Sequence, residues 1–514
     1  MLTGKTITEL YNQYLETTQK AADLGYASAV LGWDQEVYMP PKGFPYRGRQ
    51  LATLASMAHD MVTSESYGNL LEELSGRGGL SEEQADNIRL SREDYLKSKK
   101  LPTSFISKIT EQTSTSYDAW IKARKENNFA LYAPELSKMI ALKIEQAHLY
   151  GYEQHPYDAL MDDYEKGATV AMLNPVFTDV KQQLPALLNS IKYAPQVDDT
   201  FLQRYYNKDR QWEFSMEVLK KIGYDFEAGR QDLSEHPFTT SFAPEDVRVT
   251  TRVDEHDFAS LLWSSIHEGG HALYEQGLPA IQYGLPLGAA SSLAVHESQS
   301  RLWENCVGRG IHFWQYFYPQ LQKSFIVQLS DVTLEQFYKG INKVQPSLIR
   351  TEADELTYHF HVLIRYEIEK ALINKELDTA GLVDAWNSAY QHYLGVTPPD
   401  DKQGVLQDVH WAHGSFGYFP TYSLGSFYAA QYYAHAKREI ADMEILHEQG
   451  DYKPLLQWLR NKVHRHGRKY RSAELCKHIT GQGLDFNAFM QYARNKYQDV
   501  YDINTPDEAG GQHT

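Results

Sequence analysis

Apolar residues recur every three or four positions over most of the chain, with polar residues between them, and this pattern predicts helices. Two of these helices have a clear start. Residues 81–98 begin with Ser81 and Gln84 in capping-box positions, and Thr333 and Gln336 give the same pattern further along. The sequence therefore predicts a mainly α-helical protein.

Short segments rich in Pro, Gly and polar residues separate the predicted helices. They lie at residues 40–45, 76–79, 194–199, 277–288 and 397–404. No long low-complexity linker and no internal repeat divides the chain. We therefore expect one large helical domain over residues 1–505, followed by a flexible tail at 506–514.

One region departs from the helical pattern. His236 to Val253 is rich in β-branched residues and carries Pro-Glu-Asp in its middle. Such a run, interrupted by turn residues, is typical of a β-hairpin or a small sheet. The sequence thus places one small sheet just ahead of the next helix.

The helix after this sheet spans Asp257 to Gly277 and has one apolar face. Phe258, Leu261, Leu262, Ile266 and Leu273 recur at helical spacing and should face the core. Gly269 and Gly270 lie inside this helix, where each Gly costs about 1 kcal/mol relative to Ala. Either the helix tolerates a weak point, or another backbone packs closely there.

His267 and His271 lie on a neighbouring face of the same helix. Because they are four residues apart, both imidazoles project from one face, one turn from each other. This arrangement suits two nitrogen ligands at about 2.0–2.1 Å from one zinc ion. Glu268 follows the first His and could take a proton from a water that the metal activates. The alternative is two surface histidines on an ordinary helix.

A third ligand is needed, and Glu297 is our candidate. It lies 26 residues beyond His271, in residues 291–308, which also show the helical pattern. Two His and one Glu, with the fourth position left for water, is an arrangement of catalytic zinc. Glu297 could instead form an i,i+4 ion pair with Arg301, and both could hold together. His296 and Glu304 are alternative ligands.

Composition and charge exclude several other classes of function. The net charge of −17 argues against DNA, RNA and anionic membranes as main partners. The basic run Arg460–Arg471 is expected to be a solvated helix end and turn.

Cys306 and Cys476, the two cysteines, cannot build a disulfide framework, which favours a reducing compartment. With no signal-peptide pattern and no membrane span, we expect a cytoplasmic protein.

Eight separated motifs are spread over nearly the whole chain. They are Leu31–Gly43, His236–Phe238, Asp246–Thr250, His267–His271, His296–Arg301, Ile349–Asp354, Gly404–Trp411 and Gly414–Tyr422. In these motifs and their order, the chain resembles the thermostable carboxypeptidase (Taq) family of metallopeptidases, which is related to angiotensin-converting enzyme and the neurolysin-like oligopeptidases.

The resemblance implies a saddle-like helical body with a deep central groove. It also implies removal of single C-terminal residues from peptides with broad preference, and a homodimer. The family's divalent metal is usually written as zinc, although cobalt or manganese supports some members. An endo-oligopeptidase or dipeptidyl carboxypeptidase on the same scaffold, an aminopeptidase, and a non-catalytic peptide-binding protein are the alternatives. The presence of Glu268 argues against the last of these, since binding alone needs no base.

A carboxypeptidase must bind a free α-carboxylate, and Arg350 is the candidate because its planar guanidinium suits a carboxylate. Thr351 and Asp354 give a capping-box pattern, which would place Arg350 just before a helix N-terminus that favours anions. The alternative is an ion pair of Arg350 with Glu352 or Asp354.

The oxyanion of the reaction needs hydrogen-bond donors. By analogy with the relatives, Tyr422 and His410 are the candidates, with Tyr418 and His413 as rivals. In the predicted sheet, Arg248 and His236 could align the substrate backbone, because an extended peptide can add to a sheet edge. An internal ion pair and a core hydrogen bond are the structural alternatives for these two residues.

Overall fold

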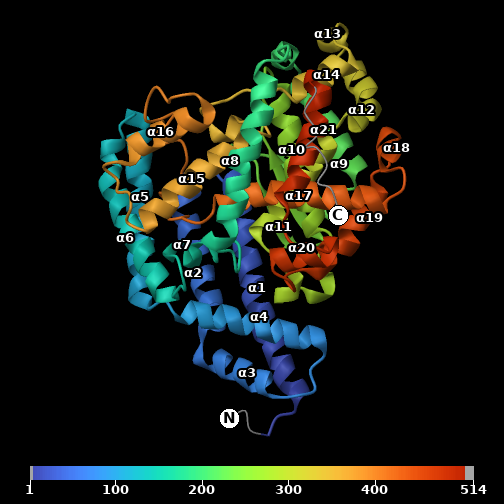
Figure 1. The fold of residues 1–514 in the computed structure, drawn as a ribbon. Helices are drawn as coiled ribbons and strands as arrows, with labels where there is room; N and C mark the ends of the chain where they lie inside the picture. The colour runs from blue at the N-terminus through green and yellow to red at the C-terminus, as the bar shows by residue number, and fades with distance from the viewer. Residues whose placement is uncertain (1–3, 504–514) are drawn as a thin grey trace, which may run out of the picture.

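The computed structural model describes residues 4–503, so the predicted tail at 506–514 lies outside the described residues. These residues form a mainly helical body, as predicted (Figure 1). The first helices are α1 (Ile7–Val37), α2 (Phe44–Thr63), α3 (Glu65–Gly76), α4 (Glu82–Lys99), α5 (Thr103–Glu126), α6 (Ala133–Tyr150), α7 (Pro156–Met161), α8 (Val170–Lys192) and α9 (Lys208–Ile222).

The second half of the chain is also helical. Its helices are α10 (Phe258–Glu275), α11 (Leu293–Arg301), α12 (Ile311–Ser324), α13 (Ile326–Leu329), α14 (Leu334–Ile341), α15 (Tyr358–Ile373), α16 (Leu382–Leu394), α17 (Pro420–Glu439), α18 (Met443–Glu448), α19 (Lys453–Lys462), α20 (Ser472–Thr480) and α21 (Phe486–Tyr501). Among residues 4–503, no helix is long and apolar enough to cross a membrane.

The predicted helix starts are confirmed where capping boxes were expected. Ser81 and Gln84 exchange hydrogen bonds at the start of α4, and Thr333 and Gln336 do so at the start of α14. The basic run after α19 forms a short helical turn, and two of its cations, Arg468 and Lys469, pair with acids of α4.

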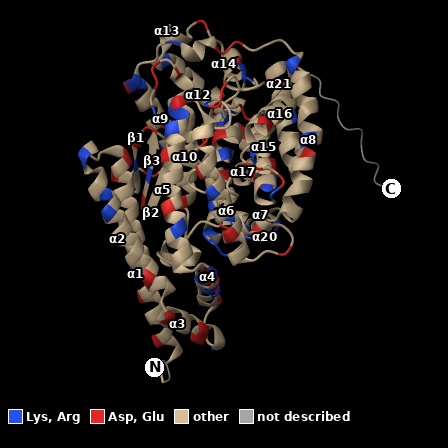
Figure 2. Cartoon of the chain, turned by 90° about the vertical axis from the view of Figure 1, so that its left-hand side faces the viewer, with Lys and Arg blue, Asp and Glu red and all other residues tan. Residues whose placement is uncertain are grey.

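The three strands β1 (Gly229–Leu233), β2 (Thr239–Ala243) and β3 (Asp246–Thr251) form one sheet of order β1-β3-β2. β2 and β3 are antiparallel, which confirms the predicted hairpin, whereas β1 pairs parallel to β3 and was not predicted. The sequence of β1, GRQDL, has no run of β-branched residues, so pairing with β3 decides its conformation. The sheet lies beside α10, between that helix and α1 (Figure 2).

Two hydrophobic cores lie within the described residues. The larger one extends from Ala123 to Tyr501 and includes the apolar face of α10. The smaller one joins α1, α3 and α4 through residues such as Leu10, Tyr14 and Leu71. Figure 1 shows these N-terminal helices at one end of the molecule, below the large helical body.

Close helix packing brings α10, α11 and α17 together at the centre of the large core. A Cβ added to Gly270 of α10 would lie 2.7 Å from the backbone of Gln299 and Ser300 in α11. A Cβ added to Gly425 of α17 would lie 2.5 Å from Cγ of Glu297. The close approach expected at the paired glycines of α10 is therefore confirmed, and the absence of a side chain at Gly270 is what permits it.

Two predicted details around later motifs need revision. The helix predicted over 291–308 begins as α11 but continues as a π-helical segment, Leu302–Gly308. The capping box predicted for Thr351 and Asp354 is wrong, because α15 begins only at Tyr358. Asp354 instead accepts hydrogen bonds from the backbone N–H groups of Leu356 and Thr357, a local turn that competes with helix formation.

Candidate metal centre and substrate site

His267 and His271 of α10 and Glu297 of α11 meet at one point. Their candidate ligand atoms all lie within 4.8 Å of one another. Nε2 of His267 lies 3.6 Å and Nε2 of His271 lies 3.4 Å from Oε2 of Glu297. Ligands about 2.0–2.1 Å from a tetrahedral metal are about 3.4 Å apart. These three residues therefore fit a single metal ion.

The outer nitrogens of both imidazoles are held by hydrogen bonds. Nδ1 of His267 lies 2.8 Å from Oε2 of Glu304, and Nδ1 of His271 lies 3.1 Å from the carbonyl oxygen of His296. Because both acceptors need a proton on Nδ1, each Nε2 is left with a lone pair that faces Glu297. Of the alternative ligands, Glu304 thus orients His267, and His296 contacts Nδ1 of His271 through both its carbonyl oxygen and its own Nδ1, which lies 2.6 Å away.

Charges around Glu297 keep it ionised although it is buried. Burial alone would raise its pKa, but Arg301 and the two histidines hold the pKa of Glu297 well below its usual range. Nε of Arg301 donates to Oε1 of Glu297 at 2.7 Å, which leaves Oε2 directed at the histidines. The predicted i,i+4 ion pair therefore exists together with the metal-binding geometry.

Replacing Glu304 with Gln is expected to weaken metal binding about 10–100-fold, because the amide no longer holds His267 with a charged acceptor. Metal affinity can be measured by competition with a chromophoric chelator. The exposed Glu217 of α9 provides a matched control, Glu217→Gln, which should bind metal like the unmodified protein. Equal affinity of the Glu304 variant and this control would contradict the orienting role.

Glu268 is buried beside the cluster and is held by the sheet. The hydroxyl of Thr239 in β2 lies 2.7 Å from Oε2 of Glu268 and 2.9 Å from its carbonyl oxygen. The edge strand β2 thus fixes the carboxylate in place. A carboxylate with one oxygen still available can accept a proton from a water near the cluster.

Arg350 is buried in an ion-pair network. Its Nε and Nη2 donate to Oδ1 of Asp408 at 3.1 and 2.8 Å, and its Nη1 donates to the hydroxyl of Tyr358 at 3.0 Å. Arg365 of α15 donates to the other oxygen of Asp408 at 2.6 Å. The expected alternative partners, Glu352 and Asp354, make no ion pair with Arg350 among the described residues. A guanidinium has five N–H bonds, and three of those of Arg350 are used here, so two make no hydrogen bond to a described residue.

Tyr422 and His410 lie close to Arg350. The guanidinium carbon of Arg350 is 5.0 Å from the ring centre of Tyr422, whose hydroxyl lies 3.4 Å from Nε2 of His410. Burial, together with Arg350 and Arg365, lowers the pKa of His410 to about 4, so this imidazole is neutral near pH 7. Burial raises the pKa of Tyr422 well above its usual range, so its hydroxyl keeps its proton. Both residues can donate a hydrogen bond without a change of charge.

Tyr418 and His413, the two alternative donors to the oxyanion, lie in different places. The ring of Tyr418 lies 5.2 Å from that of Tyr422 and 5.3 Å from that of His410. Burial, together with the negative charge of Glu297, raises the pKa of both tyrosines, so both hydroxyls keep their protons near neutral pH. His413 is exposed and lies against Tyr117 of α5, with 5.0 Å between their rings.

Arg248 and His236 lie in and beside the small sheet, and neither belongs to the metal cluster. Arg248 lies on the central strand β3, where its backbone is already paired on both sides, and its side chain pairs with Asp246 at 2.8 Å. His236 is exposed in the segment between β1 and β2. The sheet edge beside Glu268 belongs to β2, so an added peptide strand would pair there and not with β3.

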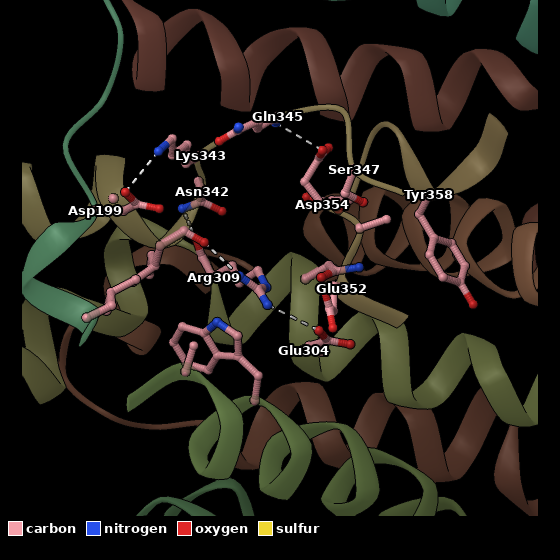
Figure 3. A pocket seen from close by; sticks show the side chains of 18 of the residues that line it. Asp199, Glu304, Arg309, Asn342, Lys343, Gln345, Ser347, Glu352, Asp354 and Tyr358 are labelled. Carbon is pink, nitrogen blue, oxygen red and sulfur yellow. Dashed lines mark hydrogen bonds and ion pairs between the residues drawn. The ribbon is translucent and has the colours of Figure 1, made fainter. Parts of the chain in front are cut away.

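A cavity of about 490 Å³ opens next to these groups (Figure 3). Its lining includes Arg301 and Glu304 from the metal side and Tyr358 from the Arg350 side. The guanidinium of Arg301 lies 4.7 Å from the ring centre of Tyr358. Figure 3 shows Arg309, Glu304 and Glu352 close together on one wall. The cavity is polar and lies behind the residues that support the site: its lining touches neighbours of the metal cluster and of Arg350, but not the three clustered ligands or Arg350 itself.

Sequence reasoning missed three supporting residues, Thr239, Asp408 and Arg365. Asp408 lies within the motif Gly404–Trp411, and an Arg in an enclosed binding site needs an acid near it, so an acid in this motif was the available signal. Thr239 and Arg365 had no such signal, because their contacts join segments 29 and 43 residues apart.

Comparison with known proteins agrees with this geometry. Residues 13–497 match the family described as carboxypeptidase Taq (M32) metallopeptidase. The thermostable carboxypeptidase 1 of Thermus thermophilus is 40% identical over 504 residues, which cover 96% of this chain and 99% of that protein. Carboxypeptidase 1 of Bacillus subtilis is 38% identical over 491 residues, or 95% and 98% of the two chains.

A solved structure is equally similar. The crystal structure of the M32 carboxypeptidase from Deinococcus radiodurans R1 superposes with a TM-score of 0.95 at 40% identity, covering 96% of this chain and all of that one (100%). A family match over most of the chain and relatives of this identity and coverage leave no other family to consider. The chain therefore belongs to the carboxypeptidase Taq (M32) family and is a metallocarboxypeptidase that uses a divalent metal.

Proposed function

We propose that this enzyme removes single residues from the free C-terminus of peptides, with broad preference, and that zinc is its metal. The observation that carries the proposal is the pair of unused N–H bonds on Arg350, a buried cation beside Tyr422. Two imidazole nitrogens and one carboxylate are a common ligand set of catalytic zinc, which supports zinc as the metal.

Each residue of the site has a defined task in this reaction. A zinc ion on His267, His271 and Glu297 would polarise the peptide carbonyl and make the attacking water more acidic. Glu268 accepts the proton of that water and passes it to the departing amine. Tyr422 and His410 donate hydrogen bonds to the developing oxyanion, and both side chains are uncharged near pH 7.

Recognition of the substrate end follows from the same network. Arg350 binds the α-carboxylate through its two remaining N–H bonds, while Asp408 keeps the guanidinium in position. The upstream backbone pairs with the edge of β2. His236, in the segment that leads into β2, and Arg248, on the neighbouring central strand, would contact the upstream residues.

Peptides with a C-terminal amide should be cleaved with a kcat/KM lower by about 10²-fold or more than the same peptides with a free acid, because the amide cannot pair with Arg350. Mass spectrometry of the products would check this. An endo-oligopeptidase would cleave both forms equally, and a dipeptidyl carboxypeptidase would release dipeptides. An N-acetylated free acid is the control, since only an aminopeptidase would reject it.

We further propose a homodimer in a reducing, cytoplasmic setting. The homodimer follows from the resemblance to the family. The setting is supported by Cys306 and Cys476, which are both buried free thiols in the structure. Sedimentation of the purified enzyme would measure its oligomeric state, and a monomer at micromolar concentration would contradict the first part.

A further inference from the structure

Glu369 of α15 is a completely buried carboxylate that makes three hydrogen bonds outside its own helix. Its Oε1 accepts from Nε1 of Trp411 at 2.7 Å. Its Oε2 accepts from the hydroxyl of Tyr157 at 2.6 Å and from the backbone N–H of Gly417 at 2.9 Å. Two of these donors belong to the segment 407–418, which carries His410 and Tyr418 and leads directly into α17 with Tyr422.

The same helix holds the start of this segment. Arg365, one turn before Glu369, donates to Asp408 at 2.6 Å and to the side chain of Gln407 at 2.8 Å. Arg365 and Glu369 are four residues apart and therefore lie on one face of α15. This face thus holds the segment at its beginning through a cation and near its end through an anion.

The segment has no regular secondary structure of its own to fix its shape. Turn hydrogen bonds join its residues, such as the bond from Ser415 N–H to the carbonyl of His410 at 2.8 Å. Gly417 has φ of +96°, and a Cβ there would lie 2.8 Å from the backbone of Leu160 in α7. Loss of the bond to Glu369 would release this contact, and the turns would transmit the movement to His410 and Tyr418.

We propose that Glu369 is a positioning residue, which fixes the hydrogen-bond donors His410, on segment 407–418, and Tyr422, just after it, for the transition state. It acts through Trp411 and Gly417 and touches no substrate. This inference rests on the proposed roles of His410 and Tyr422. Removing the anchor should lower kcat more than it raises KM, because the substrate carboxylate is held separately by Arg350.

The charge of Glu369 is sensitive to pH near neutrality. Burial raises the pKa of Glu369 to about 7, against the opposing effects of Tyr157, Gly417, Trp411 and Arg365. The other ionisable groups that face it are Tyr164, which follows α7, and Lys143 of α6, whose pKa burial lowers to about 8. Below this pKa, Glu369 takes up a proton and loses the negative charge that attracts its three donors. The hold of Glu369 on the segment therefore weakens as pH falls.

The test compares three substitutions in the metal-loaded enzyme. Glu369→Gln should lower kcat about 10–100-fold with KM changed less than about threefold, as expected when donors are displaced by a fraction of an ångström. Tyr157→Phe removes one of the three bonds and should give a smaller loss. Tyr366→Phe is the matched control, because this neighbouring buried tyrosine donates to Asn174 and not to Glu369.

A second readout does not depend on turnover. Titration of Glu369 next to the indole of Trp411 should produce a transition in tryptophan fluorescence near pH 7, present in the unmodified enzyme and absent in Glu369→Gln. Measuring Tyr422→Phe alongside separates the two proposals. Unchanged kcat in that variant would contradict the oxyanion role, while the fluorescence result would still test the anchor.

Two results would overturn the inference. One is a kcat within twofold of the unmodified enzyme for Glu369→Gln, and the other is a KM that rises by the same factor as kcat falls. A fluorescence transition of unchanged amplitude in this variant would contradict the titration of Glu369 near pH 7. If Glu369→Gln does not fold, Tyr157→Phe decides the question, and equal kcat for Tyr157→Phe and Tyr366→Phe would then overturn it.

Discussion

Glu268→Gln is expected to lower kcat by about 10²–10⁴-fold while the protein still binds its metal. The carboxylate is not one of the three clustered ligands, so the metal site remains complete. The Gln amide oxygen can still accept the hydrogen bond from Thr239, so the side chain should keep its position. What is lost is the ability to take a proton from water, and this affects turnover only.

Metal content by atomic absorption and steady-state kinetics on one free-acid peptide would check this expectation. The exposed Glu217→Gln variant of α9 serves as the matched control and should keep full activity. Two outcomes would contradict the role of Glu268 as the catalytic base. One is turnover of the Glu268 variant equal to that of the control, and the other is a loss of activity that parallels the loss of bound metal.

Arg350→Gln is expected to lower kcat/KM for free-acid peptides about 10²–10³-fold, because a buried charge that pairs with the substrate carboxylate is removed. The same substitution should hardly change the slow cleavage of C-terminal amides. The ratio between acid and amide substrates should therefore fall towards one. This collapse of discrimination distinguishes loss of carboxylate recognition from a general loss of structure.

The control for this experiment is Arg204→Gln, which breaks a surface ion pair with Asp331 and should leave the ratio unchanged. We expect the Arg350 variant to fold, because Asp408 keeps Arg365 as a partner. A thermal melt would check this. If the folded variant still prefers free acids by the original factor, another group binds the carboxylate.

Local rules predicted much of the helical architecture. The starts of α4 and α14 and the whole of α10 could be read from capping and periodicity, because these features depend on residues less than one or two turns apart. The same rules failed before α15, where Thr351 and Asp354 have a capping pattern but no helix begins. There Asp354 caps a local turn, and side-chain to backbone bonds of this kind compete with a helix.

For the site, the sequence alone determined that His267 and His271 face one direction with Glu268 between them, because helical geometry fixes side chains four residues apart. It also indicated, through the family motifs, which distant residues belong with them. Only the tertiary structure decided that Glu297 reaches the two imidazoles, that Thr239 holds the base, and that Asp408 rather than a near neighbour holds Arg350. The first of these contacts depends on the packing of α10, α11 and α17 through Gly270 and Gly425. All three join segments far apart in the sequence, and no local pattern encodes the distance between such segments.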